Sequence, residues 1–365
     1  MKEIKVVQIV RGIGPTSMPW NDLHSNIKKL SPGLSLPPMV IGKLFGKSEW
    51  KLKLSSNGRN YLYLESSVFS SLIFIFKLAS RAKKSNSIIV FHVHNPSLFI
   101  VALFIKLFFK RNFLVTNLHN DWRFFKIHQK IGLHILARIS KYFITVSYAI
   151  KSTIPNQCAK KLLANNKLNS IPNGIRLAGF SNYNNGPRNK VMVIVARMVP
   201  QKNCFFAIDI LAKSKCIEKL IWIGDGVQRE SILQYAKKLK VISKLDLMGV
   251  ISREQVYDVL NNSSIYIAPS KWEGIGVANL EAAALGCIPF LSDIPPHQEI
   301  ATNINIKTYS LKESESWAND IDCIFGVPFK EDRHKRDEIS RITMKKYNLD
   351  NAIQKYIEIY NKDLN

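Results

Sequence analysis

The first half of the chain has very few acidic residues. Residues 1–180 contain 5 Asp and Glu against 27 Lys and Arg, a charge of +22, whereas residues 181–365 contain 22 against 25, a charge of +3. Together the halves account for the net charge of +25. This asymmetry predicts that the first half faces a polyanion, which is either a nucleic acid or an anionic membrane surface.

Cysteine is scarce, and long apolar runs are missing. The five cysteines are scattered and form neither a CxxC pair nor a disulfide framework, which is typical of a reducing cytoplasm. The most apolar stretch, residues 98–109, is too short to cross a bilayer and contains Lys106. The N-terminal sequence MKEIKVVQIVRG is too short and too charged for a signal peptide. We therefore expect a cytoplasmic protein without a transmembrane helix.

Apolar runs alternate with helical patterns along the whole chain. Strands are expected at 4–10, 87–93, 113–119, 142–147, 191–196, 220–224, 244–249, 264–270 and 288–292. Helical patterns separate them, for example at 203–214, 227–240 and 253–261. This alternation predicts βαβ units, and therefore parallel sheets with helices on both faces.

The length of 365 residues favours two domains, and the polar stretch Ser181–Lys190 is the best linker candidate. We expect an α/β protein with two doubly wound, Rossmann-like domains facing a central cleft. The predicted first domain comprises residues 1–180, the linker 181–190 and the second domain 191–345. A C-terminal helix, residues 346–365, is expected to pack back on the first domain. Ligands of such sheets bind beyond the carboxyl ends of the strands.

Two cations and two acids lie at predicted strand ends of the second half. Arg197 follows the strand at 191–196, and Lys202 precedes a helix, so both favour an anion site, although a solvated surface pair fits equally well. Glu273 lies in a Gly-rich loop. Glu281 lies in an apolar helical pattern that ends at Gly286, where a carboxylate is costly unless it is paired. A partly exposed helix acid is the alternative for Glu281.

Two other patterns suggest metal sites, and we reject both. His92 and His94 share one face of a strand, but no third ligand with metal spacing accompanies them. The stretch Asp320–Asp322 lies in a polar, helix-like segment and is read as a solvated helix face.

Five segments carry a resemblance to a known family. They are IPNGI (171–175), ARMVPQKN (196–203), IGDGVQRESI (223–232), LMGVI (247–251) and YIAPSKWEGIGVANLEAAALGCIPFLSD (266–293). In this order they resemble the GT-B glycosyltransferases of family 4. The family's Glu-x7-Glu motif is matched by Glu273 and Glu281, and its Arg-x4-Lys pair by Arg197 and Lys202.

The resemblance implies a role for each of these residues. Glu281 would bind the ribose of a nucleotide, Glu273 the transferred sugar, and Arg197 and Lys202 the donor diphosphate. The backbone of Gly224 and of the loop Gly274, Ile275, Gly276 and Val277 would complete the donor site. His119 would face the donor sugar near the reacting centre, its alternative being a strand-end histidine bonded to a backbone carbonyl. Gly12 and Gly14 would lie beside the acceptor and the diphosphate, although their spacing departs from the commoner form of the family.

The function that follows from the resemblance is transfer of a sugar from a nucleotide diphosphate sugar to a lipid-linked or saccharide acceptor. We expect retention of configuration, no metal or other cofactor, and a place in bacterial surface polysaccharide assembly. The basic first half would dock on the anionic inner face of the membrane. The docking cations would be Lys77, Arg81, Lys83, Lys84, Lys106, Lys110 and Arg111. The alternatives are a nucleotide-sugar epimerase or hydrolase on the same scaffold, and a basic nucleic-acid-binding protein, for which no motif is visible.

Overall fold

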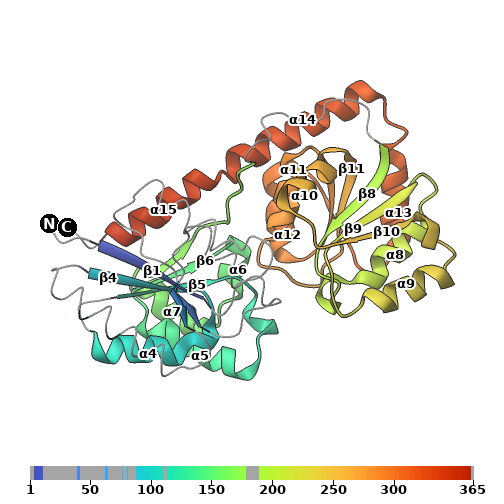
Figure 1. Cartoon of the computed structure of the whole chain (residues 1–365). Helices are drawn as coiled ribbons and strands as arrows, with labels where there is room; N and C mark the ends of the chain where they lie inside the picture. The colour runs from blue at the N-terminus through green and yellow to red at the C-terminus, as the bar shows by residue number, and fades with distance from the viewer. Residues whose placement is uncertain are drawn as a thin grey trace. The chain divides into compact units, whose positions relative to one another are not determined.

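The computed structural model describes residues 4–10, 39–41, 62–64, 76, 80, 88–109, 113–177 and 189–362. The chain divides into two compact units (Figure 1). The first comprises Met1–Asn173 together with Asp350–Asn365, and the second comprises Gly174–Leu349.

The first unit contains a parallel sheet of seven strands in the order β3-β2-β1-β4-β5-β6-β7. The strands are β1 (Ile4–Val10), β2 (Met39–Ile41), β3 (Leu62–Leu64), β4 (Ile88–Val93), β5 (Phe113–Leu118), β6 (Tyr142–Thr145) and β7 (Leu168–Ser170). Its described helices of more than one turn are α4 (Phe99–Phe108), α5 (Ile127–Ile139), α6 (Tyr148–Thr153), α7 (Asn156–Ala164) and α15 (Leu349–Asn361). The chain reverses its direction of strand addition between β1 and β4, and ligands bind at such a point.

The second unit repeats this plan with a parallel sheet of six strands in the order β10-β9-β8-β11-β12-β13. The strands are β8 (Asn189–Val195), β9 (Lys219–Ile223), β10 (Leu245–Gly249), β11 (Ser263–Ala268), β12 (Ile288–Ser292) and β13 (Thr308–Tyr309). The helices are α8 (Cys204–Lys213), α9 (Arg229–Lys238), α10 (Arg253–Asn261), α11 (Val277–Ala284), α12 (Pro295–Ile304), α13 (Ser314–Ile324) and α14 (Phe329–Lys346). Here the switch point lies between β8 and β11.

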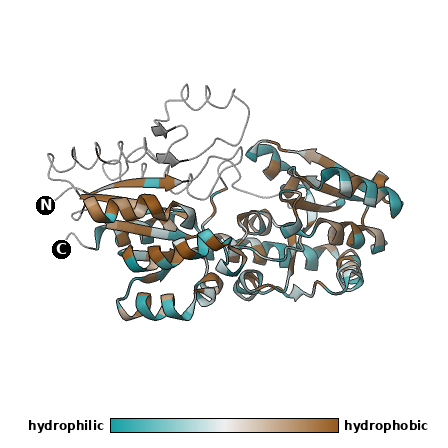
Figure 2. Cartoon of the chain, turned by 90° about the horizontal axis from the view of Figure 1, so that it is seen from below, coloured by the Kyte–Doolittle hydropathy of each residue, from teal (hydrophilic) through white to brown (hydrophobic). Residues whose placement is uncertain are grey.

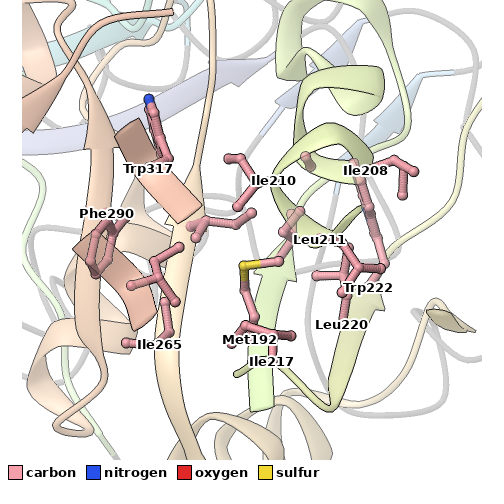
Figure 3. Close-up of a cluster of buried hydrophobic side chains, with 14 of the residues drawn as sticks. Met192, Ile208, Ile210, Leu211, Ile217, Leu220, Trp222, Ile265, Phe290 and Trp317 are labelled. Atoms are coloured by element: carbon pink, nitrogen blue, oxygen red, sulfur yellow. The ribbon is translucent and has the colours of Figure 1, made fainter. Parts of the chain in front are cut away.

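Each unit has its own apolar core between sheet and helices. In the second unit the side chains of Met192, Trp222 and Phe290 from the sheet meet Leu211 of α8 and Trp317 of α13 (Figure 3). The described strands are mostly hydrophobic, whereas the helices also carry polar residues (Figure 2). Strands buried on both faces explain why the sequence shows continuous apolar runs instead of alternation.

The unit boundaries differ from the predicted domain boundaries. The segment around Ile175 belongs to the second unit because its N–H bonds the Tyr347 carbonyl at 2.7 Å and its own carbonyl accepts from Leu349 N at 3.1 Å. Asn189 and Lys190 were predicted to belong to the linker, but they are the first two residues of β8. The Lys190 carbonyl accepts a hydrogen bond from the N–H of Glu218, next to β9. Residues 346–348 precede α15, which begins at Leu349.

The final helix contributes to the first unit. Tyr356 accepts a hydrogen bond from Asn117 at 2.9 Å, and Tyr360 bonds His92 Nδ1 at 2.7 Å. Among the described residues, none of the helices combines the length and hydropathy that a membrane span requires.

Candidate functional site

The loops that follow β8 and β11 meet at the switch point of the second unit. The first loop ends in the short helix Pro200–Lys202, and the second contains Trp272 and Glu273. Gln201 joins them twice, because its carbonyl accepts from Lys271 N at 2.8 Å and its side chain donates to the Trp272 carbonyl at 2.7 Å. Lys202 and Glu273, which are 71 positions apart, form an ion pair between the same loops.

Glu273 is a buried carboxylate that remains charged. Only 7% of the residue is exposed, and its Oε1 also accepts a hydrogen bond from Ser270 Oγ at 2.8 Å. Burial alone would raise the pKa of Glu273, but the charge of Lys202 and the hydrogen bonds from Lys202 and Ser270 lower it overall. The acid and the cation that were predicted to act on one ligand are therefore already paired.

Arg197 differs from Lys202 in its surroundings. Its side chain is exposed directly after β8, while its carbonyl accepts a hydrogen bond from Val199 N at 3.0 Å. The strand end thus presents one exposed cation and one cation held by a buried acid. A ligand with two phosphate groups matches such a pair of charges.

His297 is a buried residue of α12 that interacts electrostatically with Glu273, and the sequence did not predict it. Ser292 donates its hydroxyl proton to the Ser270 carbonyl at 2.7 Å, so it accepts from His297 Nδ1 at 2.9 Å. Burial lowers the pKa of His297 to about 4, against the opposing charge of Glu273. The only sequence signal was a histidine in the first turn of a helix, after a buried strand.

Glu281 on α11 is held by two residues of α10. Its Oε1 accepts from Arg253 at 2.7 Å and from Tyr257 at 2.9 Å, and only 8% of the residue is exposed. The alternative of a partly exposed helix acid is therefore wrong. Arg253 and Tyr257 were missed, although their spacing of four places them on one face of a helix.

The glycines of the Gly-Asp-Gly turn are required by the protein's own backbone. Gly224 has φ +128°, and a Cβ there would lie 2.2 Å from the Ala196 carbonyl oxygen. Its N–H bonds the Gly249 carbonyl at 2.7 Å. The family resemblance assigns the Gly224 backbone to the donor site, whereas the structure shows that this glycine is needed for the close approach of the loop after β8.

The loop before α11 has one glycine in the left-handed region. Gly276 is the N-cap of α11 with φ +75°, and Gly286 ends the helical segment with φ +73°. Gly274 is buried, and Val277 begins the helix. Ile275 was predicted to act through its backbone; its side chain is 1% exposed and packs in the core.

His119 lies in the first unit, at the end of β5, and is half-buried. Its Nε2 bonds His94 Nδ1 at 2.9 Å, so the alternative of a bond to a backbone carbonyl is not what the structure shows. Burial lowers the pKa of His119 to about 4. Gly12 and Gly14 lie outside the described residues.

The two histidines of the rejected metal pattern, His92 and His94, bond other side chains. His92 bonds Tyr360, and His94 bonds His119 and Gln8. Over the described part of the chain, His, Cys, Asp and Glu side chains nowhere form a group of three that could hold a metal ion.

The reading of Asp320–Asp322 as a solvated helix face is wrong for its last residue. Asp322 accepts hydrogen bonds from Ser214 Oγ at 2.5 Å, Lys215 N at 2.8 Å and Cys216 N at 3.1 Å. It fixes the connection between α8 and β9. Asp320 forms an ion pair with Lys307.

Residues 180–341 match the family described as Glycosyl transferases group 1. The match covers 162 of the 365 residues, which is less than half of the chain. The buried Glu273 and Glu281, together with Arg197 and Lys202, all fall within the group 1 region.

Curated relatives are distant and are matched over part of their length. A GDP-mannose:cellobiosyl-diphosphopolyprenol alpha-mannosyltransferase of Xanthomonas campestris is 23% identical over 213 residues, which are 56% of this chain and 55% of that protein. A UDP-Gal:alpha-D-GlcNAc-diphosphoundecaprenol alpha-1,3-galactosyltransferase of Escherichia coli is 29% identical over 155 residues, 38% of this chain and 40% of that protein. The chain thus spans about half the length of these relatives.

Solved structures match almost the whole chain. Anabaena Alr3699/HepE in complex with UDP aligns with a TM-score of 0.78 and 16% identity, covering 98% of this chain and 100% of that one. A glycosyltransferase from Rickettsia africae ESF-5 aligns with a TM-score of 0.76 and 17% identity, covering 99% of both chains. The predicted GT-B fold, with two parallel α/β domains, is confirmed.

Proposed function

We propose that the protein transfers a sugar from a nucleotide diphosphate sugar to a hydroxyl of a lipid-linked or saccharide acceptor, in the assembly of bacterial surface polysaccharide. The observation that carries the proposal is the switch point of the second unit, where Lys202 and Glu273 join the loops after β8 and β11; Arg197 lies on the first of these loops, and Glu281 lies on the helix that follows the second. The names of the two curated relatives above describe sugar transfer to diphosphate-linked polyprenols, which supports an acceptor of this class.

Each charged residue at the switch point has capacity for a ligand. An ammonium group has three donor protons, so Lys202 can hold Glu273 and a phosphate oxygen together. A carboxylate has about four acceptor sites, so Glu281 can keep Arg253 and Tyr257 and still accept from ribose hydroxyls. Glu273 lies on the loop that precedes α11, and it binds hydroxyls of the transferred sugar.

In this proposal Arg197 and Lys202 stabilise the negative charge on the departing diphosphate. Their two positive charges take the place of a divalent metal. The acceptor hydroxyl attacks the anomeric carbon as the bond to the diphosphate breaks. The leaving phosphate oxygen takes the acceptor proton on the same face, so the configuration is retained. This path uses no enzyme nucleophile.

A donor screen tests the proposal. The full chain is incubated with UDP- and GDP-sugars and a diphosphate-linked polyprenol glycan, and the released nucleoside diphosphate and the extended glycan are measured. Arg197→Ala should lower transfer by about 10²–10³, the usual cost of losing one transition-state contact. Lys237→Ala, which removes an exposed cation of α9, is the matched control and should leave the rate unchanged.

Two results would contradict the proposal. One is full activity of Arg197→Ala. The other is donor cleavage at the same rate with and without the acceptor, which would indicate a hydrolase.

We further propose that the first unit docks on an anionic membrane surface. On α4, Leu107 and Phe108 are 68% and 63% exposed beside the exposed Lys106, while Val101, Ala102 and Ile105 are buried. An exposed apolar face next to cations suits the interface of an anionic bilayer. The remaining predicted docking cations, Lys77, Arg81, Lys83, Lys84, Lys110 and Arg111, lie outside the described residues.

Neighbouring α5 offers a similar surface. It packs against α4, and its Ile127 and Ile131 are 79% and 51% exposed.

Co-sedimentation with vesicles of increasing anionic lipid content measures docking. Leu107→Asp with Phe108→Asp should reduce it, whereas Val250→Asp, an exposed apolar position of the second unit, should not. Equal binding by both variants would contradict docking through α4.

A further inference from the structure

A chain of hydrogen bonds runs through the switch point of the first unit. Gln8 of β1 bonds His94 Nε2 through its Oε1 at 2.5 Å, and His94 Nδ1 bonds His119 Nε2 at 2.9 Å. Gln8 is 1% exposed and His94 is 7% exposed, while His119 is half-buried. The chain therefore leads from the interior of the unit to the histidine expected to face the donor sugar.

The order of donors and acceptors in this chain is determined by its first member. An amide oxygen can only accept, so His94 Nε2 must carry the proton that is donated to Gln8. Burial, with the neighbouring histidines, lowers the pKa of His94 well below its usual value, so the ring is neutral and its Nδ1 is an acceptor. His119 Nε2 must then be the donor.

The orientation of the Gln8 amide is held from the C-terminal helix. The Gln8 side chain also hydrogen-bonds the hydroxyl of Tyr360 on α15, and an amide nitrogen facing that oxygen leaves Oε1 facing His94. Tyr360 is 0% exposed and also bonds His92 Nδ1 at 2.7 Å. The last helix thus reaches the same network as β1, β4 and β5.

We propose that Tyr360, Gln8 and His94 are positioning residues that hold His119 in its Nε2–H tautomer and leave Nδ1 as a hydrogen-bond acceptor. In the reaction proposed above, on which this part of the inference rests, Nδ1 of His119 accepts a hydrogen bond from a substrate hydroxyl. A ring held in this tautomer selects a hydroxyl donor and disfavours a sugar with only an acceptor at that position.

The tautomer is measured directly by long-range ¹H–¹⁵N correlation on the full chain labelled with ¹⁵N-histidine at pH 7. His119→Gln identifies the His119 signals by their loss. We expect the Nε2 shift of a protonated nitrogen and the Nδ1 shift of an unprotonated one. Protonation on Nδ1 in the wild type would overturn the proposal.

Two variants change the network at a distance from His119. Gln8→Glu places a carboxylate against His94, which favours the doubly protonated ring, so His119 Nε2 must accept and its proton moves to Nδ1. Tyr360→Phe removes the hydroxyl that orients Gln8, and the His119 shifts should move toward an average of both tautomers. Tyr356→Phe removes the other buried hydroxyl of α15, which bonds Asn117, and is the matched control. His119 shifts that are unchanged in both Gln8→Glu and Tyr360→Phe would refute the relay.

The activity of the same variants separates this inference from the proposed function. Gln8→Glu should lower kcat/KM for the donor about tenfold, the size of one lost hydrogen bond, with unchanged affinity for the bare nucleoside diphosphate. Tautomer shifts as expected without any sugar transfer by the wild type would leave the relay standing and refute the proposed function. Transfer with unchanged kcat/KM in Gln8→Glu would refute the role of the relay in the reaction.

Discussion

The ion pair between Lys202 and Glu273 allows a quantitative test of how the candidate site is held. The side chains are 18% and 9% exposed, so both charges have lost most of their contact with water. Removing one partner of a buried pair costs about 3–5 kcal/mol, because the remaining charge is left without compensation. Lys202 keeps some access to solvent, so we expect the lower end, about 3 kcal/mol, for Glu273→Gln.

This loss should be visible in calorimetry of the full chain, in the transition assigned to the second unit. For a domain of this size 1 kcal/mol shifts Tm by about 2–4 °C, so the expected shift is about 6–12 °C. Asp246→Asn is the matched control. It breaks the pair of Asp246 with Lys219, whose side chains are 39% and 48% exposed, and should cost less than about 1 kcal/mol.

The double variant decides whether the pair itself is responsible. Lys202→Met combined with Glu273→Gln leaves no uncompensated charge, so its stability should exceed the value expected from adding the two single losses. The reasoning would be refuted if the losses of stability in the two single variants were additive in the double variant. It would also be refuted if the Glu273→Gln protein had the same Tm as the wild type.

Three further outcomes are expected. Gly224→Ala should destabilise the second unit strongly in thermal melts, because its Cβ would lie 2.2 Å from the Ala196 carbonyl oxygen. Gly249 also has a positive φ but has open space around its Cβ position, so Gly249→Ala should cost only about 1 kcal/mol. Equal costs for the two variants would contradict the close-packed turn. Thermal stability should fall as the pH is lowered from 6.5 to about 4. Burial lowers the pKa of His119 and His297 to about 4, so in this range the unfolded chain binds protons that the folded chain does not. A His297→Gln protein with the wild-type pH profile would argue against a contribution from His297. Glu281→Ala should weaken binding of the bare nucleoside diphosphate in calorimetry, and unchanged affinity would exclude the ribose role.

The sequence by itself determined the fold class and the location of the candidate site. Apolar runs alternating with helical patterns predicted parallel sheets because strands covered on both faces carry no polar alternation. Arg197, Lys202, Glu273 and Glu281 could be selected because they follow strand ends or interrupt an apolar helix, and these are local features. The helix cap at Gly286 could be predicted for the same reason.

Only the tertiary structure decided what these residues contact. The partners of Glu273 and Glu281, namely Lys202, Arg253 and Tyr257, come from other elements, and no local pattern specifies which strands lie side by side. The sequence linked Gly224 to a ligand, but its need for glycine comes from another loop. The bonds from Tyr360 to His92 and from His94 to His119 also depend on the packing of segments distant in sequence, which local propensity cannot encode.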